Sequence, residues 1–198
     1  LAETELRHVS FENAWGMPYY IQTVGQFRYA ALVLDGASPS LTELSFSQIN
    51  TSSVMTTNLA QPTFNGGNFA VGVGDDGQRV GSALQIYSSG SSVSPFLLSD
   101  ITLTATNNGC GQQAGGRSAI WAEDSFIDIQ NAEITGDYGL YLRTSAGSVT
   151  DSVMEVNCNG IDLWGKKAVG STSFGFEISG NEITTVEGSG IYGAGSSY

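Results

Sequence analysis

The feature that most constrains the fold of this chain is a repeat of about twenty residues. Its first motif is a pair of apolar residues five positions apart with polar or small residues between them, as in Leu-Thr-Glu-Leu-Ser-Phe at 41–46. Such pairs recur at Leu6/Phe11, Leu41/Phe46, Phe96/Ile101, Ile129/Ile134, Val149/Met154 and Ile178/Ile183. A pattern that returns at a fixed period indicates a chain built from repeated structural units.

The second motif is a small residue followed by alternating apolar positions. It occurs as Ala31-Leu-Val-Leu, Ala83-Leu-Gln-Ile, Ala119-Ile-Trp-Ala, Gly139-Leu-Tyr-Leu, Gly160-Ile-Asp-Leu and Gly190-Ile-Tyr-Gly. Ala31, Ala119 and Gly139 each precede a first motif by ten residues, and the steps from Ala119 to Gly139 to Gly160 are 20 and 21 residues. Alternation predicts β-strands, and the Gly, Ser, Asn and Asp clusters between them predict tight turns.

Short strands at a period of about twenty predict an all-β solenoid of about six coils, spanning residues 1–198 as a single domain. Stacked coils lie about 4.8 Å apart, so inward residues form columns. One predicted column is Leu32, Leu84, Ile120, Leu140, Ile161 and Ile191, and a second is Leu34, Ile86, Ala122, Leu142 and Leu163. An antiparallel sandwich of short strands is the alternative.

The repeat resembles that of the right-handed parallel β-helix proteins of the pectate-lyase-like superfamily. Residues 31–46 and the segment Gly-Phe-Glu-Ile-Ser-Gly-Asn-Glu-Ile-Thr at 175–184 carry the resemblance, which extends over most of the chain. It implies a right-handed parallel β-helix with loop insertions. It specifies function poorly, because that superfamily spans lyases, hydrolases, epimerases, tailspikes and non-catalytic surface proteins.

Three stretches interrupt the pattern, and the ends lack a cap. Residues 50–80 predict an insertion or one poorly patterned coil, while 107–117 and 166–173 predict loops. Neither end shows an amphipathic helix that would shield a terminal coil. We therefore expect the open ends to meet other copies or neighbouring domains, or the sequence to be an excerpt of a longer protein.

Composition narrows the function classes. The net charge is −12 with only 7 Lys and Arg, too few for the basic face that a nucleic-acid binder needs. No apolar run is long enough for a transmembrane segment. Few Lys and abundant Ser, Thr, Asn and Gly indicate an extracellular or cell-surface protein.

Outward positions of the second-motif strands hold the main candidate site. Two adjacent columns contain the aromatic and charged residues expected there: Tyr87, Trp121, Glu123, Tyr141, Arg143, Asp162, Trp164 and Tyr192. Aromatic rings stack on sugar rings and carboxylates bind hydroxyls, so the face predicts glycan contact. A stabilising aromatic ladder, coverage by a loop, and a protein–protein contact are the alternatives.

The same face is the candidate catalytic site if the protein is an enzyme. Glu123 and Asp162 lie two coils apart, about 9.6 Å along the stack, at the upper limit for inverting glycosidases. Arg143, on the coil between them, is the third candidate, to neutralise a uronate or to act as a base. A surface ion pair is the alternative for Arg143, because arginine almost never loses its proton. The paired-Asp and Gly-His-Gly motifs of polygalacturonase-like hydrolases and the Asp-Pro-His of alginate-epimerase-like proteins have no counterpart, and the one histidine, His8, occupies the position of Glu43 and Asp151 in other coils.

Two further features leave alternatives open. Asp75 and Asp76, flanked by Gly74 and Gly77, are a weak candidate for Ca²⁺, although Asp-Gly favours a plain turn; no other cofactor is expected.

Cys110 and Cys158 fall two coils apart, so a disulfide requires the 107–117 loop to cross the intervening coil. Two free thiols are the alternative.

These observations predict a non-catalytic extracellular or cell-surface module: a rigid, adhesive scaffold with an aromatic and acidic face for glycan or protein contact. Its open ends would stack on other subunits or domains. A polysaccharide lyase or glycoside hydrolase is the second expectation, and a subunit of a filament or spike is the third.

Overall fold

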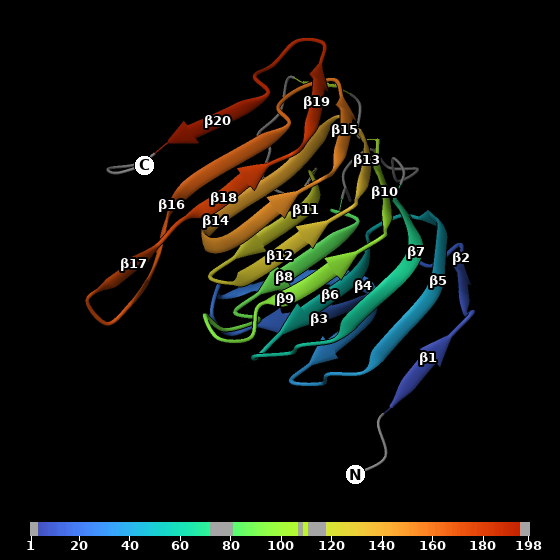
Figure 1. Ribbon diagram of the computed structural model, residues 1–198. Coiled ribbons are helices and arrows are strands. Elements are labelled where there is room, and N and C mark those ends of the chain that lie inside the picture. The colour runs from blue at the N-terminus through green and yellow to red at the C-terminus, as the bar shows by residue number, and fades with distance from the viewer. Residues whose placement is uncertain (1–3, 72–80, 107–108, 111–117, 195–198) are drawn as a thin grey trace.

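A computed structural model of the chain describes residues 4–71, 81–106, 109–110 and 118–194. The described residues contain β-strands and no helix, and nearly all of the strand pairings are parallel. The chain passes repeatedly through the same three rows of strands, and we call one passage through all three rows a coil (Figure 1). Within the described residues six such coils are complete, where the sequence predicted about six.

Row 1 holds the strands that carry the second motif, together with β6. Its strands, in order, are β4 (Gln26–Asp35), β6 (Ser52–Thr57), β8 (Leu84–Tyr87), β11 (Ser118–Glu123), the first part of β14 (Tyr138–Thr150), β16 (Ile161–Val169) and β20 (Ile191–Ala194). The predicted inward column from Leu32 to Ile191 is in register here, with Val54 as an additional member.

Rows 2 and 3 hold the two halves of the first motif. Row 2 is β1 (Glu5–Arg7), the first part of β5 (Ser40–Ile49), the first part of β7 (Thr63–Val71), β9 (Phe96–Ser99), β12 (Phe126–Gln130), the last part of β14 and β18 (Phe176–Ser179). Row 3 is β2 (Ser10–Glu12), the last parts of β5 and β7, β10 (Thr102–Ala105), β13 (Glu133–Gly136), β15 (Val153–Val156) and β19 (Glu182–Thr185).

A left-handed residue at the corner between rows 2 and 3 explains the five-residue spacing. His8, Glu43, Asp100, Asn131 and Asp151 all have φ between 51° and 55° at this corner. One residue in this conformation turns the chain while the apolar residues on either side of the corner continue to face inward. Asn, Asp and His tolerate the left-handed region better than most residues, so His8 has a conformational role that it shares with its equivalents in other coils.

The core lies between the three rows and is apolar. Phe46, Phe64 and Phe69 are fully buried, and the centroids of the Phe46 and Phe69 rings are 5.3 Å apart on successive coils. The rings therefore continue from coil to coil, as expected for inward columns.

Two predictions about the repeat are wrong in detail. Residues 52–71 form a regular coil, whose Phe64 and Phe69 occupy the first-motif positions, so the irregularity predicted for residues 50–80 does not extend over this part. In the next coil, Leu98 and Leu103 occupy those positions instead of Phe96 and Ile101. Ile101 is buried at the corner, directly after the left-handed residue Asp100. Because Ile101 is apolar and follows Phe96 by five positions, the two residues matched the spacing of the first motif without occupying its positions.

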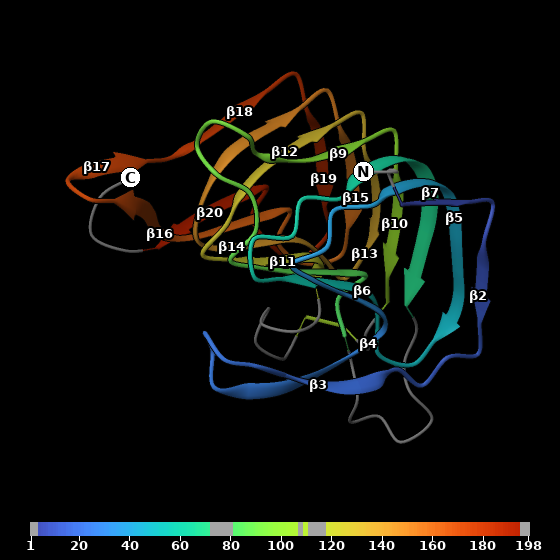
Figure 2. The ribbon, with the colours of Figure 1, turned by 90° about the horizontal axis from the view of Figure 1, so that it is seen from below.

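Two antiparallel hairpins project from row 1. β3 (Met17–Ile21) pairs with the first half of β4 and lies outside the row that contains β6 and β11 (Figure 2). β17 (Thr172–Phe174) pairs with the end of β16, so the loop predicted at 166–173 is instead a hairpin.

Candidate functional site

The outward face of row 1 brings together the residues predicted to form the site. Trp121, Tyr141, Asp162 and Tyr192 are in register in one column. Tyr87, Glu123, Arg143 and Trp164 are in register in the adjacent column. The parallel pairing repeats the same register at each step, so a position in one coil determines the position of its equivalents in the others.

The aromatic side chains of this face form a continuous series, which we call the aromatic ladder. The ring centroids are 6.5 Å apart for Tyr87–Trp121, 5.3 Å for Trp121–Tyr141, 6.2 Å for Tyr141–Trp164 and 5.9 Å for Trp164–Tyr192. These separations lie in the range of favourable aromatic contacts. The ladder therefore stabilises the stacking of the coils, as one of the alternatives predicted.

The β3–β4 hairpin covers the N-terminal part of the ladder. Ile21 and Ala30 pack with Met55, Tyr87 and Trp121 in a second apolar cluster outside row 1. As a result, the exposed fraction is only 1% for Tyr87 and 9% for Trp121. The prediction that these two rings face solvent is wrong, because a hairpin from the first complete coil folds back over them.

Arg28 joins the hairpin to the ladder. Its Nε donates a hydrogen bond to the Tyr87 hydroxyl at 3.2 Å, and its guanidinium carbon lies 5.3 Å from the centroid of the Trp121 ring. Burial raises the pKa of Tyr87 to about 12, although the nearby Arg28 charge acts in the opposite direction. Tyr87 is therefore neutral at physiological pH and has a structural role.

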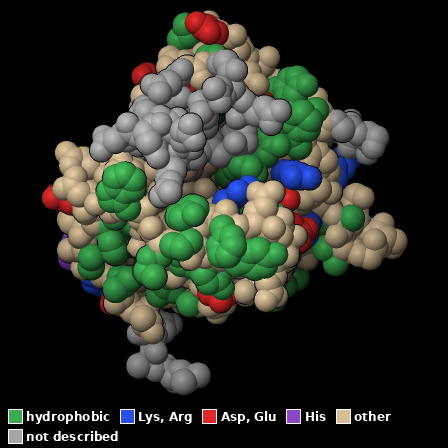
Figure 3. All heavy atoms as spheres, turned by 180° about the vertical axis from the view of Figure 1, so that it is seen from behind, with side chains coloured by type: hydrophobic (Ala, Val, Ile, Leu, Met, Phe, Trp, Pro, Cys, Tyr) green, Lys and Arg blue, Asp and Glu red, His purple; other side chains and the backbone are tan. Residues whose placement is uncertain are grey.

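The C-terminal part of the ladder is open. Trp164 is 40% exposed and Tyr192 is 42% exposed, while Tyr141 is half-buried between Trp121 and Trp164. Figure 3 shows the molecule from behind, with apolar side chains at the surface and basic and acidic groups near some of them. The exposed rings of Trp164 and Tyr192 are inclined to each other by 52°, and each offers an apolar face that a sugar ring can stack against.

The charged residues of the face are held in structural contacts. Arg143 and Glu123 form an ion pair at 3.4 Å, as the sequence indicated. Asp162 is buried and accepts a hydrogen bond from the Asn159 amide at 2.8 Å. Burial raises the pKa of Asp162, and the hydrogen bond from Asn159 lowers it by a smaller amount. Glu123 is paired and Asp162 is shielded, so the arrangement is suited to holding the face together and to binding.

The remaining predicted sites have different outcomes. Asp75 and Asp76 lie outside the described residues, and within the described part of the chain no group of His, Cys, Asp and Glu is arranged to hold a metal ion. Cys110 and Cys158 form a disulfide with Cα atoms 5.4 Å apart. The Tyr138 hydroxyl, at the corner between the intervening coil and the next one, donates a hydrogen bond to the Cys110 carbonyl. Cys110 therefore lies against that corner, as a disulfide between these positions requires.

The sequence reasoning missed the β3–β4 hairpin, whose Ile21 and Arg28 shape this site. The signal that could have found it is the Gly-containing turn Gln-Thr-Val-Gly at 22–25, which stands between two segments rich in Tyr and Phe. Two such segments joined by a short turn with glycine are typical of a β-hairpin. The hairpin occurs in one coil only, so the repeat itself does not reveal it.

The comparisons with known proteins add no relative. No family model matches the chain, and neither the curated proteins nor the solved structures give a significant match. Within the described residues, no helix has the length and apolar character needed to cross a membrane.

Proposed function

We propose that the protein is a right-handed parallel β-helix of the kind found in the pectate-lyase-like superfamily, acting as a non-catalytic module outside the cell or at its surface. The three rows of parallel strands and the left-handed corner residues support this fold. The Cys110–Cys158 disulfide supports the location, because disulfides persist mainly in oxidising compartments.

The module binds glycan through the open part of the aromatic ladder. The observation that carries this proposal is the exposure of Trp164 and Tyr192 beside the half-buried Tyr141, in a series of ring contacts that holds all three in place. Rings that are already fixed lose little conformational entropy when a ligand binds. Glu123 is paired with Arg143 and Asp162 accepts a hydrogen bond from Asn159, contacts that suit a structural role in the binding face.

The terminal coils provide the second contact surface. Ile191 is 50% exposed, whereas Ile161, its partner one coil earlier, is fully buried. Leu6 and Phe11 at the other end are likewise less buried than their partners in β5. The ends therefore stack on other copies or on adjacent domains, which makes the module a rigid scaffold for adhesion.

Glycan-array screening followed by titration with the best ligand tests the binding role. The double variant Trp164→Ala/Tyr192→Ala is expected to bind roughly tenfold more weakly, because it removes two stacking surfaces. Trp15→Ala/Phe27→Ala is the matched control, since both of these rings are exposed but lie outside the ladder. Equal losses in the two variants, or no binding at all, would contradict the proposal.

Assays for reducing sugars and for unsaturated products test the absence of catalysis. We expect no turnover of either acidic or neutral polysaccharides. Turnover that is abolished by Glu123→Gln or by Asp162→Asn would instead identify the protein as a polysaccharide lyase or hydrolase.

A further inference from the structure

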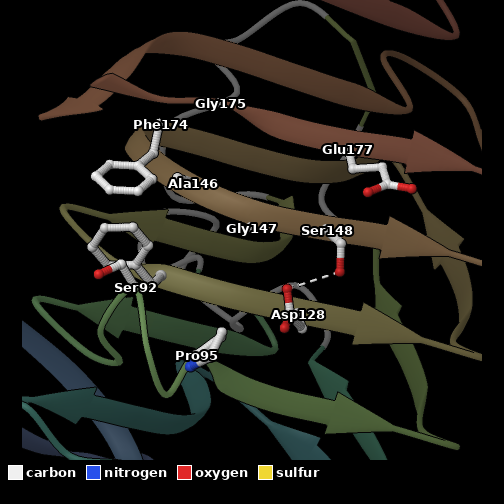
Figure 4. Close-up of a pocket in the computed structure, with 10 residues that line it drawn as sticks. Ser92, Pro95, Asp128, Ala146, Gly147, Ser148, Phe174, Gly175 and Glu177 are labelled. Carbon is white, nitrogen blue, oxygen red and sulfur yellow. Dashed lines mark hydrogen bonds between the residues drawn. The ribbon is translucent and has the colours of Figure 1, made fainter. Parts of the chain in front are cut away.

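A groove on the outer side of row 2 lies on a different face from the aromatic ladder. It has a volume of about 400 Å³ and is bounded by Ser92 and Pro95 on one side and by Phe174 and Gly175 on the other (Figure 4). Its floor is formed by strands β12 and β14, with β18 alongside. The groove therefore extends across several successive coils.

Small residues make the groove hollow. Ala146, Gly147 and Gly175 line it without long side chains. Gly147 has φ +140°, and a Cβ at this position would lie 1.8 Å from the Ile127 carbonyl oxygen. No other residue fits there without a backbone shift, so the hollow is part of how the coils stack.

One end of the groove is aromatic. Phe126 and Phe174 also line it, and their rings meet edge to face with centroids 5.2 Å apart. Phe174 comes from the β16–β17 hairpin, whose Lys167 is paired with Asp124. Because Lys167 is held in that ion pair, the hairpin is fixed against the earlier coil and the aromatic wall is preformed.

The rest of the groove is acidic. Asp128, Ser148 and Glu177 are in register on successive coils, so the backbones of the two acidic residues are about 9.6 Å apart along the stack, twice the strand spacing. Ser148 donates a hydrogen bond to Asp128 at 2.8 Å, and Glu177 extends from the neighbouring strand (Figure 4). Among the described residues that line this groove there is no Lys or Arg.

These features indicate which kind of ligand the groove can bind. The floor strands β12 and β14 pair with other strands on both sides, so they offer no free backbone edge to which a peptide could add as a strand. Recognition must use side chains: two carboxylates and hydroxyl groups for polar contacts, and Phe and Pro surfaces for the apolar face of a ring. The charge favours a cation.

We propose that this groove binds a short oligosaccharide of amino sugars in their protonated, unacetylated form. The ammonium groups contact Asp128 and Glu177, and the sugar rings lie against Pro95 and Phe174, since Phe126 is almost fully buried. Charge-assisted hydrogen bonds of this kind are among the stronger polar contacts in proteins. Binding in the groove is independent of glycan contact at the aromatic ladder.

Calorimetric titration with a tetramer of glucosamine near pH 6 tests the proposal. The fully N-acetylated tetramer has the same backbone without the charge and is expected to bind roughly tenfold more weakly. Asp128→Asn/Glu177→Gln is expected to weaken binding of the glucosamine tetramer by a similar factor. Trp15→Ala/Phe27→Ala, which removes two exposed rings outside both the groove and the aromatic ladder, should leave it unchanged.

The matched control is Glu133→Gln/Glu155→Gln, which removes two exposed carboxylates from row 3 and changes the net charge equally. An equal loss in this control would show that only the general acidity attracts the ligand, and would overturn the proposal. Absence of binding by the glucosamine tetramer would do the same. Tetralysine binding as tightly as the sugar would show that the groove recognises charge alone, and would also overturn it.

Discussion

At the residue scale, the corner between rows 2 and 3 shows how one conformation organises the repeat. His8, Glu43 and Asp151 share it although their side chains differ in charge. Their common feature is an exposed position where the chain must turn within one residue. The sequence equivalence of these positions thus reflects a backbone requirement, and the single histidine of the chain needs no catalytic explanation.

The titration of Asp162 links its burial to the stability of the fold. Burial raises its pKa in the folded protein above the unfolded value. The folded state therefore retains a proton that the unfolded chain releases, and the free energy of unfolding falls as pH rises between the two pKa values. At neutral pH the burial of the Asp162 charge lowers the free energy of unfolding.

We accordingly expect Asp162→Asn to have a higher free energy of unfolding than the wild type at pH 7, since asparagine can still accept the Asn159 hydrogen bond without carrying the charge. The difference should disappear below about pH 3, where the carboxyl is protonated in both states. Urea denaturation across this pH range measures the effect. Asp100→Asn, at an exposed corner, is the control; an Asp162 variant less stable than wild type at pH 7 would contradict the expectation.

At the element scale, the β3–β4 hairpin decides which part of the aromatic ladder a ligand can reach. It buries Tyr87 and Trp121 and leaves Trp164 and Tyr192 open. The disulfide between Cys110 and Cys158 has a comparable effect elsewhere, because it ties the loop after β10 to the end of β15 across one coil. Both elements link coils that are not adjacent.

The hairpin depends on Ile21, which is fully buried against the ladder. We expect Ile21→Ala to reduce the free energy of unfolding by about 2–5 kcal/mol, the usual cost of such a truncation in a core. The emission of Trp121 should shift to longer wavelength as water reaches it. Tyr20→Ala on the same strand removes a half-exposed ring and is the control. Unchanged stability and emission in the Ile21 variant would mean that the hairpin does not hold this cover in place.

At the scale of the whole molecule, the coils depend on their neighbours for burial. An inner coil covers its apolar column on both sides, while Ile178 and Ile183 in the last complete coil are only partly buried. Repeat proteins need their terminal units covered for this reason. The proposed end-to-end contact meets that need.

Light scattering over a range of concentrations tests the end contact. We expect reversible self-association that Ile191→Lys weakens by roughly tenfold, because the charge would enter the apolar column at the contact. Val93→Lys is the matched control, since Val93 is exposed and lies in an inner coil, between β8 and β9. A monomer at every concentration would exclude contact between copies.

Local pattern was sufficient to predict most strands of the repeat, their parallel register and the two outward columns, because each coil pairs with adjacent coils and repeats the same motifs. It missed the coil at 52–71, whose β6 lacks the second motif. It was less reliable where two overlapping pairs of apolar residues have the same five-residue spacing, as Phe96/Ile101 and Leu98/Leu103 do. The exposure of Tyr87 and Trp121, the path that joins Cys110 to Cys158, and the groove beside Phe174 became visible only in three dimensions. Each of these depends on a hairpin or loop that reaches beyond its neighbouring coil, and such a contact has no periodic signature in the sequence.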